Sequence, residues 1–377
     1  MHEREHQNLS ETTVSEDVNQ AAPADAGSRL TAGGNLGDDG RHKEEVARLR
    51  ELSKQGDLAA TTTLAARLLV GRDAPTAPEE GVALLRAAHD AGDAQAANLL
   101  ATLAGAGAWT EQSWPQSLDL LRQAAERGSH DAGLQLTLLA TDEQLVARAR
   151  RNPEPDDWKR LRDNIDLEKW IVPPPAVSVC QNPRIWTAEN VVKPEFCNWM
   201  VSRSLGKFKR ALMFNGQKAI LAANRTNSDF VFDIVESGVC MLLLRIRVSR
   251  LVQLPIPYME PPQIFHYATG EEIGNHYDFL FDGEHGYGRT GNYTGDRLAT
   301  YLMWLNDGYE GGDLVFPKAD FRHRGKKGDG IFFASQRDGK PDKMSLHAAL
   351  PVTKRSLSPP WRSSMIARVS YLYDHSG

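Results

Sequence analysis

Three stretches between residues 265 and 352 decide the fold of the larger part of this chain. They read FHYATGEEIGNHYDFLFD at 265–282, DRLATYLMWLNDGYEGGDLVFP at 296–317 and GKKGDGIFFASQRDGKPDKMSLHAALPV at 325–352. Short apolar and β-branched runs alternate here with Gly, Asp and Asn, a pattern typical of strands joined by turns. The sequence therefore predicts an all-β barrel or double-sheet domain.

The strand pattern extends from Val177 towards the end of the chain, and two helical runs interrupt it. We expect helices near 194–206 and 231–252, packed outside the sheets. Glu310-Gly311-Gly312 predicts a hairpin turn between two strands, because glycine adopts positive φ without strain.

Three residues within these stretches are candidate metal ligands. His276 and Asp278 lie one residue apart, and on a strand two such positions face the same side. His347 begins a later apolar strand and offers a third ligand. Two imidazoles and one carboxylate leave three positions open on a metal ion, which suits non-haem iron(II). Taken alone, the motif also fits a half-buried histidine paired with a carboxylate.

The order of motifs around these residues resembles the prolyl 4-hydroxylase type of 2-oxoglutarate oxygenase. The shared elements are Y-x-x-G, H-x-D, R-x-x-T followed by LN, EGG-x-x-x-FP, G-D-x-x-x-F and S-x-H-x-x-x-P-V, together with RTNSDFVFD at 225–233. The resemblance implies a double-stranded β-helix, or jelly roll. It also implies that Fe²⁺ binds to His276, Asp278 and His347, and that 2-oxoglutarate and O₂ are co-substrates. L-ascorbate is implied as the auxiliary reductant, and the implied reaction hydroxylates an unactivated C–H bond with release of succinate and CO₂.

The co-substrate's distal carboxylate requires a buried cation, because an unpaired carboxylate in a barrel core is costly. In the family this residue follows the distal histidine by about ten positions, where this chain has Leu357. Arg362 opens the next strand and is the favoured candidate, and Lys354 is the second. A solvated basic loop is the alternative reading of this segment.

The resemblance assigns three further residues to the co-substrate pocket and one to the substrate. Tyr267 matches the tyrosine before H-x-D, Thr300 matches the strand residue that lines the pocket, and Trp304 replaces a frequent tyrosine. Tyr267 and Trp304 are also compatible with ordinary core positions. Arg225 is expected to line the substrate entrance.

The first third of the chain repeats with a period of 36 residues. The positions that recur are Gly56, Gly92 and Gly128, Leu49, Leu85 and Leu121, and Ala60, Ala96 and Ala132. Each copy predicts two amphipathic helices separated at the glycine, which is typical of a helical solenoid. The repeated sequence resembles the Sel-one-like subclass of tetratricopeptide-related repeats. Such arrays usually bind polypeptides, so a polypeptide substrate captured by the repeats is expected.

We therefore predict a multidomain α + β protein. Its parts are a disordered tail at 1–42, a helical repeat domain at 43–150, a linker at 151–176 and the dioxygenase domain at 177–377. The tail is predicted because its polar composition cannot offset the entropy cost of ordering it.

Composition narrows the class of protein. Apolar residues make up 41% and charged residues 25% of the 377 residues, with a net charge of −5, which gives no sign of a surface that binds nucleic acid. The three cysteines form no disulfide or zinc-binding pattern, and no signal peptide or membrane span is apparent. A cytoplasmic protein without a membrane partner is expected.

Two alternatives remain open at this point. The first is a non-catalytic protein-binding scaffold with a degenerate oxygenase domain, favoured by the unusual region after Val352. The second is a metalloenzyme of another class on a similar barrel, such as a zinc hydrolase, although zinc sites favour three histidines or mixed cysteine and histidine ligands.

Overall fold

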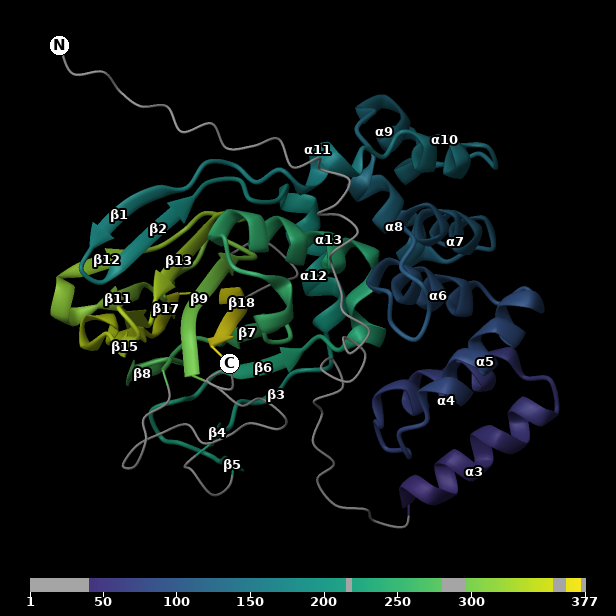
Figure 1. The fold of residues 1–377 in the computed structure, drawn as a ribbon, viewed down its shortest axis with the longest axis horizontal. Helices are drawn as coiled ribbons and strands as arrows, with labels where there is room; N and C mark the ends of the chain where they lie inside the picture. The colour runs from purple at the N-terminus through teal and green to yellow at the C-terminus, as the bar shows by residue number, and fades with distance from the viewer. Residues whose placement is uncertain (1–40, 215–218, 280–295, 355–363, 374–377) are drawn as a thin grey trace.

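The computed structural model describes residues 41–214, 219–279, 296–354 and 364–373. A helical half and a strand-rich half lie side by side (Figure 1). The helical half contains α3 (Arg41–Lys54), α4 (Leu58–Val70), α5 (Pro78–Asp90), α6 (Ala94–Ala106), α7 (Trp114–Glu126), α8 (His130–Leu139), α9 (Glu143–Arg151), α10 (Asp157–Asp163) and α11 (Leu167–Ile171). The tail predicted at 1–42 lies outside the described residues, except that α3 already begins at Arg41.

The predicted 36-residue repeat is confirmed by the helix pairs α3/α4, α5/α6 and α7/α8. Before each second helix stands a glycine in the left-handed region, where a Cβ would cost energy; these are Gly56 (φ 87°), Gly92 (φ 97°) and Gly128 (φ 93°). The next residue is an N-cap whose side chain accepts a hydrogen bond from a backbone N–H: Asp57 from Ala60, Asp93 from Ala96 and Ser129 from Ala132. The repeated residues therefore set where each helix begins.

The strand-rich half is built from two facing antiparallel sheets, as the sequence predicted. The major sheet has the order β1 (Val177–Gln181), β2 (Arg184–Ala188), β13 (Gly330–Ala334), β9 (Asp296–Trp304), β18 (Ser364–Tyr373), β7 (Gln263–Tyr267), β6 (Ser228–Val231), β3 (Lys209–Arg210). The minor sheet has the order β12 (Phe321–His323), β11 (Leu314–Phe316), β16 (His347–Ala349), β8 (Ile273–His276). Short pairs are β10 (Glu310–Gly311) with β17 (Val352–Lys354), β14 (Gln336–Arg337) with β15 (Lys340–Pro341), and β4 (Met213–Phe214) with β5 (Ala219–Ile220).

The predicted helices of this half are confirmed as α12 (Pro194–Ser204) and α13 (Ile234–Val252). Three short 3₁₀ turns complete the described elements: η1 (Ile256–Tyr258), η2 (Pro317–Ala319) and η3 (Lys343–Ser345). Among the described residues, no helix has the length and apolar character needed to cross a membrane.

The hairpin predicted at Glu310-Gly311-Gly312 is wrong in its strand partners. The strand before it, β9, belongs to the major sheet, whereas β11 after it belongs to the minor sheet. Glu310 and Gly311 pair instead with β17. Gly311 has a φ of 73°, and a Cβ there would lie 2.3 Å from the carbonyl oxygen of Pro351. The glycine thus allows the chain to cross between the sheets in close contact with β17.

Strand β9 separates two cores because successive side chains point to opposite faces of a sheet. Leu302 and Trp304 belong to the core between the two sheets. Tyr301 and Met303 face the other way, into a core that continues through α12 and α13 to the helical repeats. The interior of the jelly roll is therefore distinct from the apolar core that joins the two halves.

The helical repeats and the strand-rich half share this joining core. Helices α4, α6 and α8 contact α13, and α8 also contacts α12. The interval predicted as a linker at 151–176 contains α10 and α11, which pack on α7 and α13 respectively. One side of the repeat array is thus an intramolecular interface.

Polar groups in this interface meet at Asp131 of α8. Its carboxylate accepts hydrogen bonds from Asn98 Nδ2 and Trp199 Nε1, both at 2.9 Å, and pairs with Arg203 Nη1 at 2.8 Å. Burial alone would raise the pKa of Asp131, but Arg203 and these hydrogen bonds outweigh it and hold the pKa below its usual value. Asn98 and Asp131 come from the repeats, whereas Trp199 and Arg203 come from α12, so the network joins the halves.

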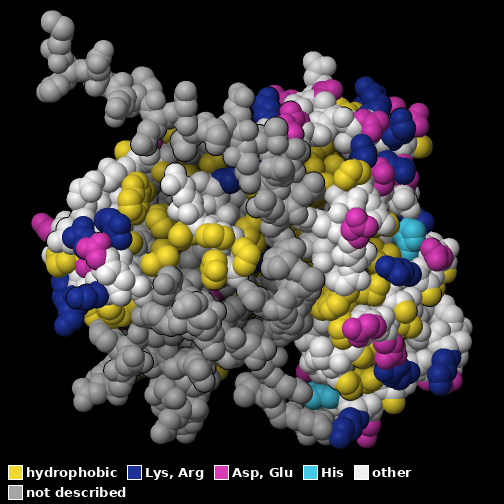
Figure 2. Space-filling view, in the orientation of Figure 1, with side chains coloured by type: hydrophobic (Ala, Val, Ile, Leu, Met, Phe, Trp, Pro, Cys, Tyr) yellow, Lys and Arg dark blue, Asp and Glu magenta, His cyan; other side chains and the backbone are white. Residues whose placement is uncertain are grey.

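Outside this interface, the helical half carries charged side chains of both signs on its surface. On the face in Figure 2, Lys and Arg side chains of the helical half are intermixed with Asp and Glu. That part of the surface therefore has no patch of a single sign.

Candidate metal centre

The two candidate histidines face each other across a pair of strands. His276 is the last residue of β8, His347 is the first residue of β16, and the two are register partners in the minor sheet. Their ring centroids lie 4.2 Å apart. Asp278 lies two residues beyond the end of β8, so the strand that was expected to carry it ends earlier. All three residues nevertheless converge, with ligand atoms within 4.8 Å of one another.

Backbone carbonyls orient both imidazole rings. Nδ1 of His276 lies 2.9 Å from the carbonyl oxygen of Gly274, and Nδ1 of His347 lies 2.9 Å from that of Ser345. Because a carbonyl oxygen can only accept, each Nδ1 carries the hydrogen, and each Nε2 presents a lone pair in the neutral ring. The Nε2 atoms lie 3.7 Å and 3.8 Å from the carboxylate oxygens of Asp278. Metal-binding histidines are usually held in this way by their second ring nitrogen.

The carboxylate of Asp278 is deeply buried and held from β9. It is 3% exposed, and the hydroxyl of Thr300 donates a 2.6 Å hydrogen bond to Oδ2. Nη1 of Arg297 lies 4.0 Å from Oδ1, and Glu260 holds the Arg297 guanidinium at 2.8 Å and 3.1 Å. A carboxylate so removed from water requires such partners.

Aromatic rings form the wall behind His347. The ring centroids of Phe316 and Phe333 lie 5.5 Å and 4.7 Å from that of His347, and both phenylalanines are fully buried. This side of the cluster is apolar, whereas His276 remains partly exposed. The cluster is therefore reached from the His276 side.

Two predicted pocket residues lie in the core between the sheets. Tyr267 is 4% exposed and makes an edge contact with Phe265, their ring centroids lying 6.5 Å apart. Trp304 is fully buried, and among the described residues its indole N–H has no hydrogen-bond partner. Its ring contacts His323 edge-on, with centroids 5.1 Å apart. An unpaired buried donor is costly, so Trp304 offers a hydrogen bond inside the barrel.

The two candidate cations for the distal carboxylate of the co-substrate are Arg362 and Lys354. Arg362 lies outside the described residues. Lys354 is on the surface, 63% exposed, with Nζ 2.8 Å from Oε1 of Glu310. Its location does not match the buried position that a carboxylate in the barrel requires.

Arg225 lies against the barrel wall rather than on an open rim. Its side chain is 12% exposed, and Nη2 lies 3.7 Å from Oδ2 of Asp229. The guanidinium carbon lies over the ring of Phe265, 5.4 Å from the ring centroid. Its backbone bridges to Ile273 of β8, the strand that ends at His276.

Sequence reasoning missed several residues that surround the cluster. The R-x-x-T motif predicts a co-substrate contact for Thr300 and no role for Arg297, whereas both side chains lie beside the Asp278 carboxylate. The motif itself was the available signal, because positions 297 and 300 both come from β9. Nothing in the sequence indicated that Phe316 and Phe333 would flank His347.

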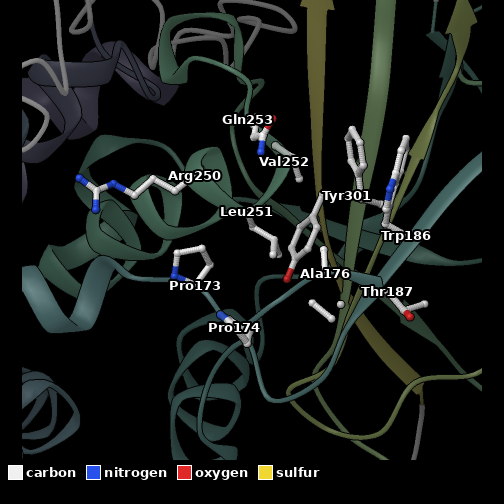
Figure 3. Close-up of a pocket in the computed structure, with 13 residues that line it drawn as sticks. Pro173, Pro174, Ala176, Trp186, Thr187, Arg250, Leu251, Val252, Gln253 and Tyr301 are labelled. Carbon is white, nitrogen blue, oxygen red and sulfur yellow. The ribbon is translucent and has the colours of Figure 1, made fainter. Parts of the chain in front are cut away.

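A cavity of about 450 Å³ on the opposite face of the major sheet contains none of these residues. Figure 3 shows it between Pro173 and Pro174, Trp186 and Leu251, with the ring of Tyr301 along one side. Burial raises the pKa of the Tyr301 hydroxyl far above its ordinary value. This cavity is therefore separate from the candidate metal centre.

Comparison with known proteins identifies the strand-rich half. The family model described as "2OG-Fe(II) oxygenase superfamily" matches residues 262–367. "Probable prolyl 4-hydroxylase 10" of Arabidopsis thaliana is 32% identical over 229 residues, covering 55% of this chain and 74% of the relative. "Prolyl 4-hydroxylase 13" of the same plant is 25% identical over 210 residues, covering 51% of this chain and 74% of the relative.

Two solved structures are also similar to this chain. A viral collagen prolyl hydroxylase from Paramecium Bursaria Chlorella virus-1 has a TM-score of 0.37 and 20% identity, covering 52% of this chain and 99% of that one. A Sel1 repeat protein from Oxalobacter formigenes has a TM-score of 0.26 and 23% identity, covering 31% of this chain and 96% of that one. Both TM-scores are below 0.5, so the assignment rests on the family model and the sequence relatives. With the relative at 32% identity covered over 74% of its length, this chain belongs to the prolyl 4-hydroxylase family of 2OG-Fe(II) oxygenases and is a 2-oxoglutarate-dependent dioxygenase.

Proposed function

We propose that His276, Asp278 and His347 hold Fe²⁺ and that the enzyme hydroxylates a prolyl residue of a polypeptide. The family implies Fe²⁺, 2-oxoglutarate and O₂. The observation that carries the metal assignment is the convergence of two Nε2 lone pairs and one carboxylate within 4.8 Å. L-ascorbate is proposed as the reductant that keeps the iron in its divalent state.

The donor set fits this metal. Two imidazoles and one carboxylate form the set typical of non-haem iron(II) sites that bind co-substrates at their open positions. Bound there, Fe²⁺ would supply the oxidation of an unactivated C–H bond, coupled to conversion of 2-oxoglutarate to succinate and CO₂.

The chain's own residues orient the ligands and exclude water. Gly274 and Ser345 fix the two imidazoles through their carbonyl oxygens, and Thr300 fixes the carboxylate of Asp278. The buried rings of Phe316 and Phe333 keep water from one side of the cluster, which strengthens the electrostatic interactions within it.

For the co-substrate we retain Arg362 as the proposed cation. Tyr267 and Trp304 are proposed to line the pocket, which their burial in the core between the sheets supports. Lys354 is the weaker candidate because it is exposed and already paired with Glu310. Arg225 remains the proposed substrate contact, supported by its bridge to β8.

A polypeptide substrate is proposed because the sequence relatives are named prolyl 4-hydroxylases. We keep the division into a repeat domain at 43–150 and a dioxygenase domain at 177–377. If the repeats take part in capture, they use the side that does not contact α13, since that helix packs on α4, α6 and α8. The three free cysteines support the proposal of a reducing, cytoplasmic location.

The substrate assignment is tested with short polypeptides that contain or lack proline. The full chain is incubated with Fe²⁺, 2-oxoglutarate and ascorbate, and the peptides are analysed by fragment mass spectrometry. We expect a gain of one oxygen atom on proline, absent with the Asp278→Ala variant and present with Asp307→Ala, which replaces an exposed aspartate. Oxygen added to another residue type would overturn the prolyl assignment while leaving the dioxygenase assignment intact.

A further inference from the structure

A second cavity, of about 380 Å³, lies where the two halves meet. Its walls come from the end of α8, from α11, from the segment before α12 and from α13, which lie together in Figure 1. Leu138 and Val192 contribute apolar surface, and Trp170 and Phe196 add aromatic rings whose centroids lie 5.7 Å apart. None of the metal-site residues lines it.

Three cations line this cavity against a single carboxylate. Lys169, Lys193 and Arg247 are the cations, and Asp166 is the carboxylate. Oδ1 of Asp166 accepts a 2.9 Å hydrogen bond from the backbone N–H of Lys169, which caps α11. Among the residues that the structure describes, none of the three cations forms an ion pair with a carboxylate. The cavity therefore has an excess of positive charge.

Arg247 is the most deeply placed of these cations. Its guanidinium stacks on the ring of Trp170 at 5.4 Å, and Nη1 donates a hydrogen bond to the carbonyl oxygen of Trp170. Nε is buried, and within the described part of the chain it has no hydrogen-bond partner. Burial lowers the pKa of Arg247. A half-buried guanidinium without a carboxylate is costly, and a bound anion would offset that cost.

The N-terminus of α12 adds to the positive potential. Lys193 is its N-cap residue and makes no side-chain hydrogen bond to the first turn, and Pro194 begins an 11-residue helix. The first turn lines the cavity through Lys193 and Phe196. The helix dipole favours an anion at such an end, although Glu195 in the first turn opposes it, Pro194 has no N–H, and the N–H of Phe196 already donates to the carbonyl oxygen of Lys193.

We propose that this cavity is a binding site for a small organic anion, a carboxylate or phosphate group attached to an apolar ring. The anionic group would lie by Arg247, Lys169 and Lys193 at the start of α12, and the ring against Trp170 and Phe196. The volume is within the range of small-molecule pockets, which combine apolar walls with a few polar groups. Such a ligand would join α8 and α11 of the helical half to α12 and α13 of the strand-rich half and stabilise the folded protein. The proposal does not depend on the metal centre.

The test uses the full chain without iron and four probes: benzoate, phenyl phosphate, inorganic phosphate and benzyl alcohol. Isothermal titration and thermal unfolding are measured without 2-oxoglutarate, which is itself a small organic anion, and the lysine variants below assign the binding to this cavity. We expect saturable binding of benzoate or phenyl phosphate, whichever matches the natural group, with a rise in Tm. Inorganic phosphate and benzyl alcohol should bind at least about tenfold more weakly, since inorganic phosphate lacks the apolar ring and benzyl alcohol lacks the anionic group.

Two lysine variants separate this site from non-specific charge effects. Lys193→Glu should weaken binding of the tighter probe by about tenfold or more, because it replaces a cation of the cavity with an anion. Lys193 is exposed, so this change should not disturb the core. Lys209→Glu makes the same charge change on β3, at the far edge of the major sheet, and should leave affinity unchanged. Equal affinities in both variants, or no saturable binding of either ring-bearing anion, would overturn the proposal. Inorganic phosphate binding as tightly as phenyl phosphate would also overturn it.

Discussion

The hydroxyl of Thr300 donates a 2.6 Å hydrogen bond to Oδ2 of Asp278, joining the major sheet to the carboxylate that follows β8. Thr300 is fully buried, and Asp278 is 3% exposed. Asp278 has no strand of its own to position it, because β8 ends at His276. The hydrogen bond from β9 therefore sets the orientation of this carboxylate relative to the two histidines.

Thr300→Val should weaken metal binding without unfolding the protein. Valine nearly preserves the side-chain shape but removes the donor, and loss of an outer partner of a metal ligand typically costs about 10-fold to 100-fold in affinity. Competition titration with Fe²⁺ or Co²⁺ under anaerobic conditions measures the change. Thr353→Val, at an exposed position, is the matched control. Equal metal affinities for the two variants would show that Thr300 does not orient Asp278.

Asp131→Ala should destabilise both halves of the protein together. The change removes the carboxylate that Arg203 and Trp199 contact in the interface, and because this pair is only partly buried the expected cost is about 2 kcal/mol, below that of a fully buried pair. Because α13 and the repeats share one apolar core, urea unfolding followed by far-ultraviolet circular dichroism and by tryptophan fluorescence should show coincident transitions at a lower midpoint. A separate early transition of one half would contradict the shared core.

The carboxylate of Asp131 should also make the free energy of unfolding depend on pH. Its pKa is lowered in the folded protein, so its contribution is complete above the unfolded value of about 3.9 and is lost as the pH falls towards the folded value. Asp131→Asn cannot titrate, so its stability should fall less than that of the wild type between about pH 4 and pH 2. Urea midpoints across this range measure the difference. Parallel pH profiles for the two proteins would exclude Asp131 as a source of the dependence.

Thiol reactivity should distinguish the three cysteines. Cys197 and Cys240 are fully buried, and burial raises the pKa of Cys197 to about 12 and that of Cys240 well above its usual value. The thiolate is the reactive form, so both should resist alkylation in the folded protein. Iodoacetamide labelling followed by peptide mapping should modify Cys180, which is partly exposed, and all three cysteines only after unfolding. Rapid labelling of Cys240 in the native state would contradict the packing of α13 on the repeats.

The sequence predicted the features that local rules determine. The recurrence of Gly56, Gly92 and Gly128 located the helix pairs, because a positive φ before a capped helix requires that residue. The register of His276 with His347 could not be predicted from spacing, since it depends on how β8 and β16 pair within the minor sheet. The order of motifs nevertheless predicted that His276, Asp278 and His347 belong to one metal site.

Features that depend on tertiary contacts were not predictable. The sequence around Asp131 gave no indication that it would bind Trp199 and Arg203, which come from a helix far along the chain. The same holds for Gly311, whose positive φ was predicted but whose partner strand was not. Arg362 remains a prediction, because it lies outside the described residues.

Iron-dependent turnover of 2-oxoglutarate by the purified full chain tests the central claim most directly. Succinate release and bound iron are measured together for the wild type, for Asp278→Ala and for the exposed control Asp307→Ala, with circular dichroism to verify folding. The account predicts one iron per chain and succinate release for the wild type and the control, and loss of both for folded Asp278→Ala. Succinate release by Asp278→Ala at the wild-type rate, or a wild-type chain that binds no iron, would contradict it.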